Sequence, residues 1–216
     1  MSTTAAELAE QFGLRTASGP LAGDSALPVH AALAGLFRGG ALRRGTAVSV
    51  DGRARLSLAY ALAAEPSKRG YWCAVVGVPE LGLSAAADLG IDPNRLIALP
   101  DPGEQWLRAV SILVETVDVL ILAAPAVPPP GGMNRLHAKL RERQAVLICL
   151  GRPLPGTGAA LTTRGPHWHG LDAGAGRLRS RTIRVAATGK LARPGTAVVS
   201  LPGEDGTLGR ALPAVS

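Results

Sequence analysis

Short runs of consecutive apolar residues alternate along the chain with longer segments whose apolar positions recur at helical spacing. The apolar runs predict β-strands at 46–50, 72–76, 96–99, 117–123 and 145–150. The segments between them predict helices at 56–64, 83–89, 103–114 and 133–143. The strands are apolar throughout, which is typical of strands buried on both faces. This alternation favours an α/β fold with a mostly parallel central sheet and helices on both faces.

The two ends of the chain have a different character. Thr3-Thr4 followed by 5–12 predicts a capped helix that ends at Gly13. A turn-rich stretch at 15–27 completes an N-terminal helix-and-linker region of residues 1–27. A second helix is expected at 29–37. Near the C-terminus, 151–180 is rich in Gly, Pro and Arg and predicts a long loop, and 181–187 with 196–201 predicts a terminal β-hairpin.

Composition limits the classes of function. Hydrophobic residues make up 47% of the 216 residues but aromatic residues only 3%, so the core must be built from Ala, Val and Leu. The formal net charge of +7 is compatible with nucleic acid or an acidic partner, and equally with a solvated, arginine-rich surface. The longest apolar run, 119–127, is too short to span a bilayer, and we expect no signal peptide, because the first residues include Glu7 and Glu10 and lack an apolar run. We therefore expect a cytoplasmic protein without a membrane partner.

Few residues suggest metal or covalent chemistry. Cys73 and Cys149 fall within predicted strands, so both are expected to be inert core thiols. The segment His167-Trp168-His169 has two ligands at H-x-H spacing but no convincing third ligand. We predict no metal, no cofactor and no catalytic residue.

Residues 35–190 are similar in order to the core of RecA recombinases. The stretch "LGIDPNRLIALPDPGEQWLRAVSILVETVDVLIL" resembles the corresponding RecA stretch nearly position by position. "GLFRGGALRRGTAVSV", "LSLAYALAA" and "LHAKLRERQAVLICLGR" resemble flanking RecA segments more weakly. The resemblance implies a RecA-like core over residues 28–216, with the C-terminal β-hairpin attached to it.

The phosphate-binding loop of that family is not retained. A RecA ATPase needs G-x-x-x-x-G-K-[ST], whose backbone N–H groups, Lys and hydroxyl hold the phosphates and Mg²⁺. Here the strand is followed by "DGRAR", which is shorter, has one glycine, Gly52, and has no Lys. Arg55 falls near the Lys position, but an Arg without the loop cannot reproduce the cradle. Ser57 is either a relic of the Mg²⁺ hydroxyl or an ordinary helix serine, and we favour the ordinary serine.

Three further family positions also differ. The resemblance places Ala123 where RecA has a carboxylate that holds Mg²⁺ through water, and Leu150 where RecA has a nucleotide-sensing Gln. The Glu that activates water corresponds to Pro79 or Glu80. A base without phosphate or metal partners has no reaction to catalyse. The chain is therefore predicted to have a RecA-like domain without a P-loop and not to be an enzyme.

Two candidate binding regions remain. The predicted loop 151–180 matches a DNA-binding loop of RecA, so its cationic and aromatic side chains are candidates for contacts with single-stranded DNA: Arg164, His167, Trp168, Arg177 and Arg179. The alternative is a flexible loop with Trp168 against the body. Leu8 and Phe12, four residues apart on the N-terminal helix, are candidates for a partner surface because RecA protomers bury such a helix against a neighbour. Alternatively, they pack on their own domain.

The chain resembles the actinobacterial ImuA-type (ImuA′) family in its size, in its lost phosphate loop and in an amino-acid composition typical of a high-GC genome. The resemblance implies a non-catalytic protein of a damage-induced mutasome for translesion synthesis. Its expected partner is an ImuB-like homologue of Y-family polymerases and, indirectly, an error-prone DnaE-type polymerase. The alternative is a RecA-derived DNA-binding protein or a SulA-like inhibitor of cell division.

Overall fold

The computed structural model describes residues 25–126, 128–129, 131–172 and 175–210. The predicted helix at 5–12, with Leu8 and Phe12, lies outside these residues. The elements in chain order are β1 (Ala26–Pro28), α2 (Ala31–Ala34), η1 (Arg38–Gly40), β2 (Ala41–Arg43), β3 (Ala47–Asp51), α3 (Arg55–Lys68), β4 (Cys73–Val76), α4 (Leu83–Asp88), η2 (Pro93–Arg95), β5 (Leu96–Leu99), α5 (Trp106–Leu113), β6 (Val119–Leu122), α6 (Gly132–Arg143), β7 (Val146–Leu150), β8 (Ala159–Asp172), β9 (Ala175–Thr188), β10 (Gly195–Ser200) and β11 (Gly209–Arg210).

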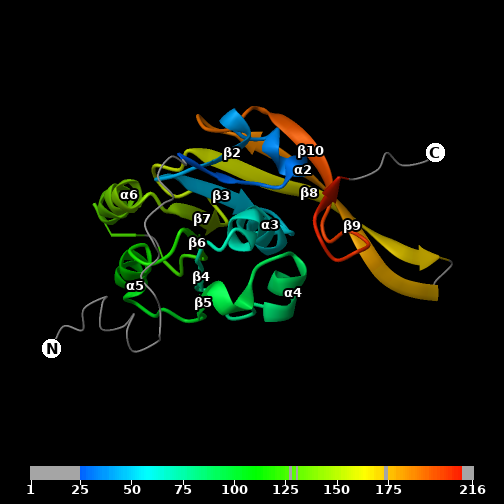
Figure 1. The fold of residues 1–216 in the computed structure, drawn as a ribbon, viewed down its shortest axis with the longest axis horizontal. Coiled ribbons are helices and arrows are strands. Elements are labelled where there is room, and N and C mark those ends of the chain that lie inside the picture. The colour runs from blue at the N-terminus through cyan, green and yellow to red at the C-terminus, as the bar shows by residue number, and fades with distance from the viewer. Residues whose placement is uncertain (1–24, 127, 130, 173–174, 211–216) are drawn as a thin grey trace.

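A nine-stranded sheet with the order β11-β10-β9-β8-β3-β7-β6-β4-β5 organises the molecule (Figure 1). Strands β3 to β8 pair in parallel, and β8 to β11 continue the sheet as antiparallel neighbours. The predicted α/β class, with a mostly parallel sheet, is confirmed. All five strands expected from apolar runs are present, and β5 has the predicted bounds.

Helices cover the two faces of the parallel part. One core packs α3 and α4 on one face, and it includes Leu58, Tyr60 and Leu62 of α3. The other core packs α5 and α6 through Val110 and Leu140 on the opposite face. Consecutive strand residues contribute alternately to the two cores, which is why these strands are apolar at every position. None of the helices in the described part of the chain is long and apolar enough to cross a membrane.

The C-terminal region departs from the prediction of a long loop at 151–180. Strands β8 and β9 form a two-stranded ribbon that extends beyond the helices in Figure 1. Register shifts between Arg164 and His167 and between His169 and Leu171 break the simple alternation that identifies strands. Residues 151–158 lie outside the strands, as predicted, whereas Gly165, Pro166 and Gly170 lie at bulges in β8. The expected hairpin is confirmed, since β9 pairs with β10 from Gly195–Ala187 to Ser200–Thr182.

The region before β3 also differs from the prediction. Instead of a helix over 29–37, one helical turn, α2, lies between β1 and η1, and β1 pairs antiparallel with β2. Strand β1 thus includes the last residues of the predicted linker. Phe37 has extended backbone (φ −113°, ψ 143°) and bridges to Ala192, so the helix cannot continue through it. Leu33, Leu36 and Phe37 are nevertheless all buried in the core, although they do not form one helix.

Candidate functional site

The loop between β3 and α3 is closed by hydrogen bonds within the protein. The Gly52 N–H donates to the Asp51 carboxylate (Oδ1, 2.7 Å), and the Arg55 N–H donates to the Gly52 carbonyl (3.2 Å). The Ala54 N–H donates to the Thr163 hydroxyl at 3.3 Å. A phosphate-binding loop directs such N–H groups toward its ligand. Here these three donors already have acceptors in the protein.

Strand β8 lies directly against this loop. The Thr163 hydroxyl donates to the Asp51 carbonyl at 3.1 Å, and Thr163 is buried. Gly52 has φ +100°, and a Cβ there would lie 2.4 Å from the Thr163 carbonyl oxygen. Gly52 is therefore required by the close approach of β8 and its own backbone conformation. Its presence does not indicate a phosphate site.

The ends of the neighbouring strands carry apolar residues at the positions that correspond to the Mg²⁺-binding carboxylate and the nucleotide-sensing Gln of RecA. Ala123 and Leu150 are partly buried and pack against the core shared with α3. A Cβ on Gly77, which follows β4, would lie 2.1 Å from the Ala123 carbonyl oxygen, so the ends of β4 and β6 are in close contact. Glu80 and Arg55 are exposed. In the described part of this edge, the Gly52, Ala54 and Arg55 N–H groups are all bonded within the protein.

Ser57 binds an arginine. The Arg181 guanidinium of β9 donates to the Ser57 hydroxyl through Nη2 (3.0 Å) and to the Leu201 carbonyl through Nε (2.7 Å). Its Cζ lies 5.0 Å from the centroid of the Trp168 ring, in a cation–π contact. Burial lowers the pKa of Arg181 from its usual value. Sequence reasoning missed Arg181 because its partners are distant in the chain.

The two faces of the ribbon present different side chains. Trp168 pairs across the strands with Arg181, on the face that looks toward α3. The other face, which we call the outer face, carries Arg164 directly opposite Arg184. Like charges placed opposite one another destabilise a strand pair unless an anion lies between them.

The histidines of the ribbon lie on the outer face as well. His167 and His169 are paired with Thr182 and Ser180, with ring centroids 4.8 Å apart at 73°. His169 Nε2 lies 2.8 Å from the Thr182 hydroxyl oxygen. No group of three or more His, Cys, Asp or Glu residues in the described part of the chain could hold a metal ion. These rings therefore form a polar surface next to Arg164 and Arg184.

The end of the ribbon that lies away from the helices carries exposed side chains, some apolar and some basic. The structure brings together here three of the predicted DNA-contacting residues, Trp168, Arg177 and Arg179, while Arg164 and His167 lie nearer the body. Leu171 and Leu178 were not predicted as functional, and they are 58% and 50% exposed. The signal in the sequence is a leucine on each side of the glycine-rich segment 172–176, with arginines on both sides of Leu178.

A family model for the MT3502 N-terminal domain matches residues 35–156 of this chain. The chain belongs to that family. It is also 35% identical over 85 residues to Uncharacterized protein Rv3395c of Mycobacterium tuberculosis, which covers 39% of either chain.

Two RecA proteins are also similar to this family member. Protein RecA of Acidiphilium cryptum is 35% identical over 116 residues, covering 48% of this chain and 34% of that protein. Protein RecA of a Wolbachia species is 33% identical over 138 residues, covering 58% and 36%. The chain spans less than two fifths of the length of each of these curated relatives. Together with the fold, these similarities support a RecA-derived, RecA-like protein.

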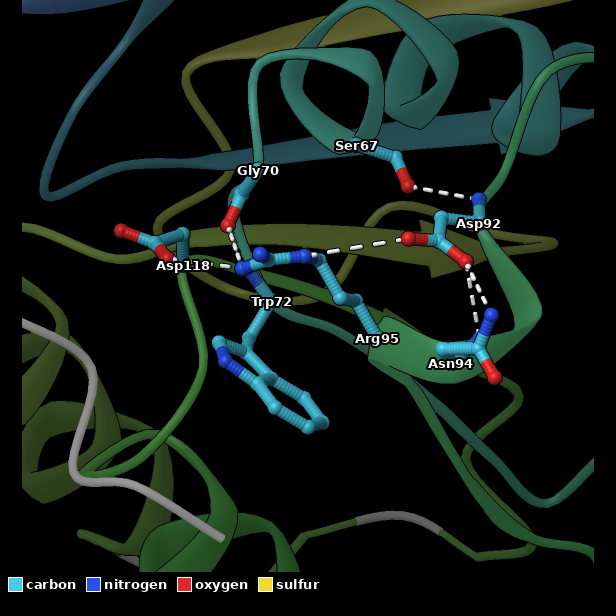
Figure 2. A network of polar contacts seen from close by, with 7 residues as sticks. All are labelled: Ser67, Gly70, Trp72, Asp92, Asn94, Arg95 and Asp118. Atoms are coloured by element: carbon cyan, nitrogen blue, oxygen red, sulfur yellow. Dashed lines mark hydrogen bonds and ion pairs between the residues drawn. The ribbon is translucent and has the colours of Figure 1, made fainter.

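Within the segment matched by the MT3502 N-terminal domain, polar residues form a network at the amino ends of the strands (Figure 2). Asp118 accepts hydrogen bonds from the Trp72 N–H (3.1 Å) and from Arg44 Nη1 (3.2 Å). Arg95 donates to the Gly70 carbonyl (2.7 Å), and the Asp92 N–H donates to the Ser67 hydroxyl (2.8 Å). The network joins the turns before β4, β5 and β6. It lies at the opposite edge of the sheet from the loop after β3.

An apolar cavity of 710 Å³ adjoins the carboxyl ends of β6 and β7. Its lining includes Leu122, Met133, Cys149 and Leu154. Arg152 is the charged residue among the described residues that line it. Burial raises the pKa of Cys149, and likewise that of Cys73, to about 12. Both cysteines are buried, as predicted, so neither offers a reactive thiolate near neutral pH.

Proposed function

We propose that this chain is a non-catalytic, RecA-like accessory protein of an error-prone translesion synthesis complex. The observation that carries the proposal is the closed loop at 51–55, whose N–H groups bind Asp51, Gly52 and Thr163 instead of a phosphate. Phosphoryl transfer depends on positioned phosphate and metal contacts. With those contacts replaced, the RecA-like scaffold would serve as a binding surface and not as an ATPase.

The partner in this proposal is an ImuB-like homologue of Y-family polymerases, with a DnaE-type polymerase recruited indirectly. The sequence resemblance to the ImuA-type family supports this choice, as does the RecA-derived core. A complex of this kind acts on damaged DNA, so we also propose a cytoplasmic location and a role in the damage response. Binding should not need ATP, because the N–H donors of the loop are already bonded within the protein.

Copurification tests the proposal directly. The chain and the ImuB-like protein of the same genome would be mixed and separated by size exclusion with and without Mg²⁺-ATP. We expect one complex of the same affinity in both conditions. Failure of the two proteins to form a complex would overturn the proposed partner.

A nucleotide assay tests the non-catalytic part separately. A site with a dissociation constant of about 10 µM would stabilise the protein by about 2.7 kcal/mol at millimolar ATP. We expect no change in melting temperature with Mg²⁺-ATP, and the RecA of the same organism provides a positive control. Stabilisation by ATP that is lost on changing Gly52 would show that the closed loop binds nucleotide after all.

Binding of single-stranded DNA is a second candidate function, and the outer face of the ribbon favours it. Arg164 and Arg184 lie opposite each other there, next to His167 and His169, and all four side chains are exposed. Contacts between arginines and phosphates give an affinity that falls steeply with salt. A fluorescein-labelled dT oligonucleotide should bind in low salt and bind less to Arg164→Glu/Arg184→Glu. Equal binding by the wild type and this variant would remove the outer face as a DNA site.

A further inference from the structure

The end of the ribbon that lies away from the helices exposes large apolar side chains. Trp168 is 43% exposed, Leu171 58% and Leu178 50%, which places three of the five exposed large hydrophobic residues of the described chain on this one hairpin. Scattered single leucines are ordinary on a surface, but apolar side chains gathered on one projecting element mark an interaction site. Figure 1 shows this element extending away from the helices.

Exposed cations lie beside these apolar groups. Arg177 and Arg179 flank Leu178 in β9, and both are exposed. Positions 168–171 and 176–179, which we call the ribbon tip, include two arginines, and Asp172 follows Leu171 in the sequence. Trp and Arg are the residue types that contribute most to binding at protein interfaces. The tip thus combines apolar anchors with positive charge at its rim.

We propose that the ribbon tip docks into an apolar pocket with a carboxylate-lined rim on a partner protein. This inference rests on the proposed function, because it assigns the surface by which the chain would bind its ImuB-like partner. In the complex, Leu171 and Leu178 enter the apolar pocket, while Trp168, on the ribbon face that looks toward α3, supports the base of the tip through Arg181. Arg177 and Arg179 pair with acidic side chains at its rim.

The fold holds the base of the tip in a fixed conformation. Arg181 ties β9 to α3 through Ser57 and to the end of β10 through the Leu201 carbonyl, and Trp168 packs over its guanidinium. The ribbon is also paired along both strands up to Leu171 and Gly176. Because these groups are ordered before binding, little conformational entropy is lost when the partner arrives.

The chemistry of the tip favours a protein over nucleic acid as its occupant. Leu171 and Leu178 cannot bind phosphates, and the directly opposed arginines of the ribbon lie on the outer face, nearer the body. A second copy of the chain is also disfavoured. The apolar cavity beside β6 and β7 could receive leucines, but its charged lining residue is Arg152, which would repel Arg177 and Arg179.

The experiment measures the affinity of the full chain for the purified ImuB-like protein by calorimetry. Leu171→Ser/Leu178→Ser and Arg177→Glu/Arg179→Glu are each expected to weaken binding at least tenfold. The matched control, Arg164→Glu/Arg184→Glu, changes two arginines of the same ribbon on its outer face and is expected to stay within threefold of wild type. All substituted side chains are exposed, so each variant should keep the wild-type melting temperature.

The outcomes separate this inference from the proposed function. If both tip variants bind the ImuB-like protein as tightly as wild type, the tip is not the docking surface, although the proposed partner stands. No binding even by wild type would overturn both. Loss of dT-oligonucleotide affinity in the leucine variant would make the tip a nucleic-acid site and overturn the inference. Self-assembly that the same variant abolishes, measured by light scattering, would show a second copy as the occupant and would also overturn it.

Discussion

Replacing Asp118 with Ala should strongly destabilise the protein, because Asp118 is the carboxylate partner of a buried arginine. Arg44 is 4% exposed, and its Nη1 donates to Asp118 (3.2 Å) and to the Gln144 carbonyl (3.0 Å). Its Nε and Nη2 have no hydrogen-bond partner among the described residues. Asp118→Ala leaves this charge with one carbonyl and the ring of Tyr71, 4.8 Å from Cζ.

Removing one partner of a buried ion pair costs about 3–5 kcal/mol, since the remaining charge stays out of water. The unpaired Trp72 N–H contributes to the same loss. For a chain of this size, 1 kcal/mol corresponds to about 2–4 °C in melting temperature, so a fall of about 6–20 °C is expected. Urea unfolding followed by circular dichroism measures the free energy, and differential scanning fluorimetry measures the melting temperature.

Two control variants test the reasoning. Glu65→Ala removes the exposed Glu65–Lys68 pair (3.0 Å) and should cost less than about 1 kcal/mol. Arg44→Met/Asp118→Ala removes both charges, so it should be clearly less destabilised than the sum of the two single variants. The reasoning is refuted if Asp118→Ala costs no more than Glu65→Ala, or if the double variant shows simple additivity.

Three further predictions concern buried groups. Thr163→Val should lower the free energy of unfolding in urea by about 1–3 kcal/mol, because the Ala54 N–H loses its acceptor, and an unchanged value would contradict the closed loop. Since burial raises the thiol pKa of Cys73 and Cys149 to about 12, neither should react with Ellman's reagent at pH 8 until the protein unfolds. Burial also raises the pKa of Tyr60 to about 12, above its unfolded value near 10, so its contribution to stability is present below pH 10 and is lost as the pH rises toward 12. Tyr60→Phe should lose less stability over that interval than wild type, as measured by urea midpoints.

The sheet and its helices could be predicted from sequence because their signals are local. Continuous apolar runs place β3 to β7, and spacing such as Trp106 to Val110 places α5. The failures occur where local signals conflict with long-range contacts. The turn at α2 keeps the apolar spacing of a helix, yet Phe37 pairs with Ala192, which no local pattern indicates.

The candidate site could be predicted only as a set of residue types. Sequence comparison identified the short loop after β3, and Arg164, Trp168 and Arg177 were chosen for their chemistry. Their arrangement on two faces depends on the bulges between β8 and β9. Glycines at these bulges are typical of loops, so the sequence does not indicate strands there. The bonds from Arg181 to Ser57 and from Ala54 to Thr163 join residues 124 and 109 positions apart, beyond the range of any periodicity.

Those two long-range bonds connect the closed loop with the ribbon. The Thr163 hydroxyl of β8 accepts a hydrogen bond from the Ala54 N–H of the loop, and Arg181 of β9 binds Ser57, near the N-terminus of α3. The same contacts fix the base of the ribbon against α3. A substitution that opened the loop, such as Thr163→Val, should therefore also loosen the ribbon, which hydrogen exchange over β8 and β9 would detect. If exchange in the ribbon stayed unchanged while stability fell, the loop and the ribbon would be independent features of the fold.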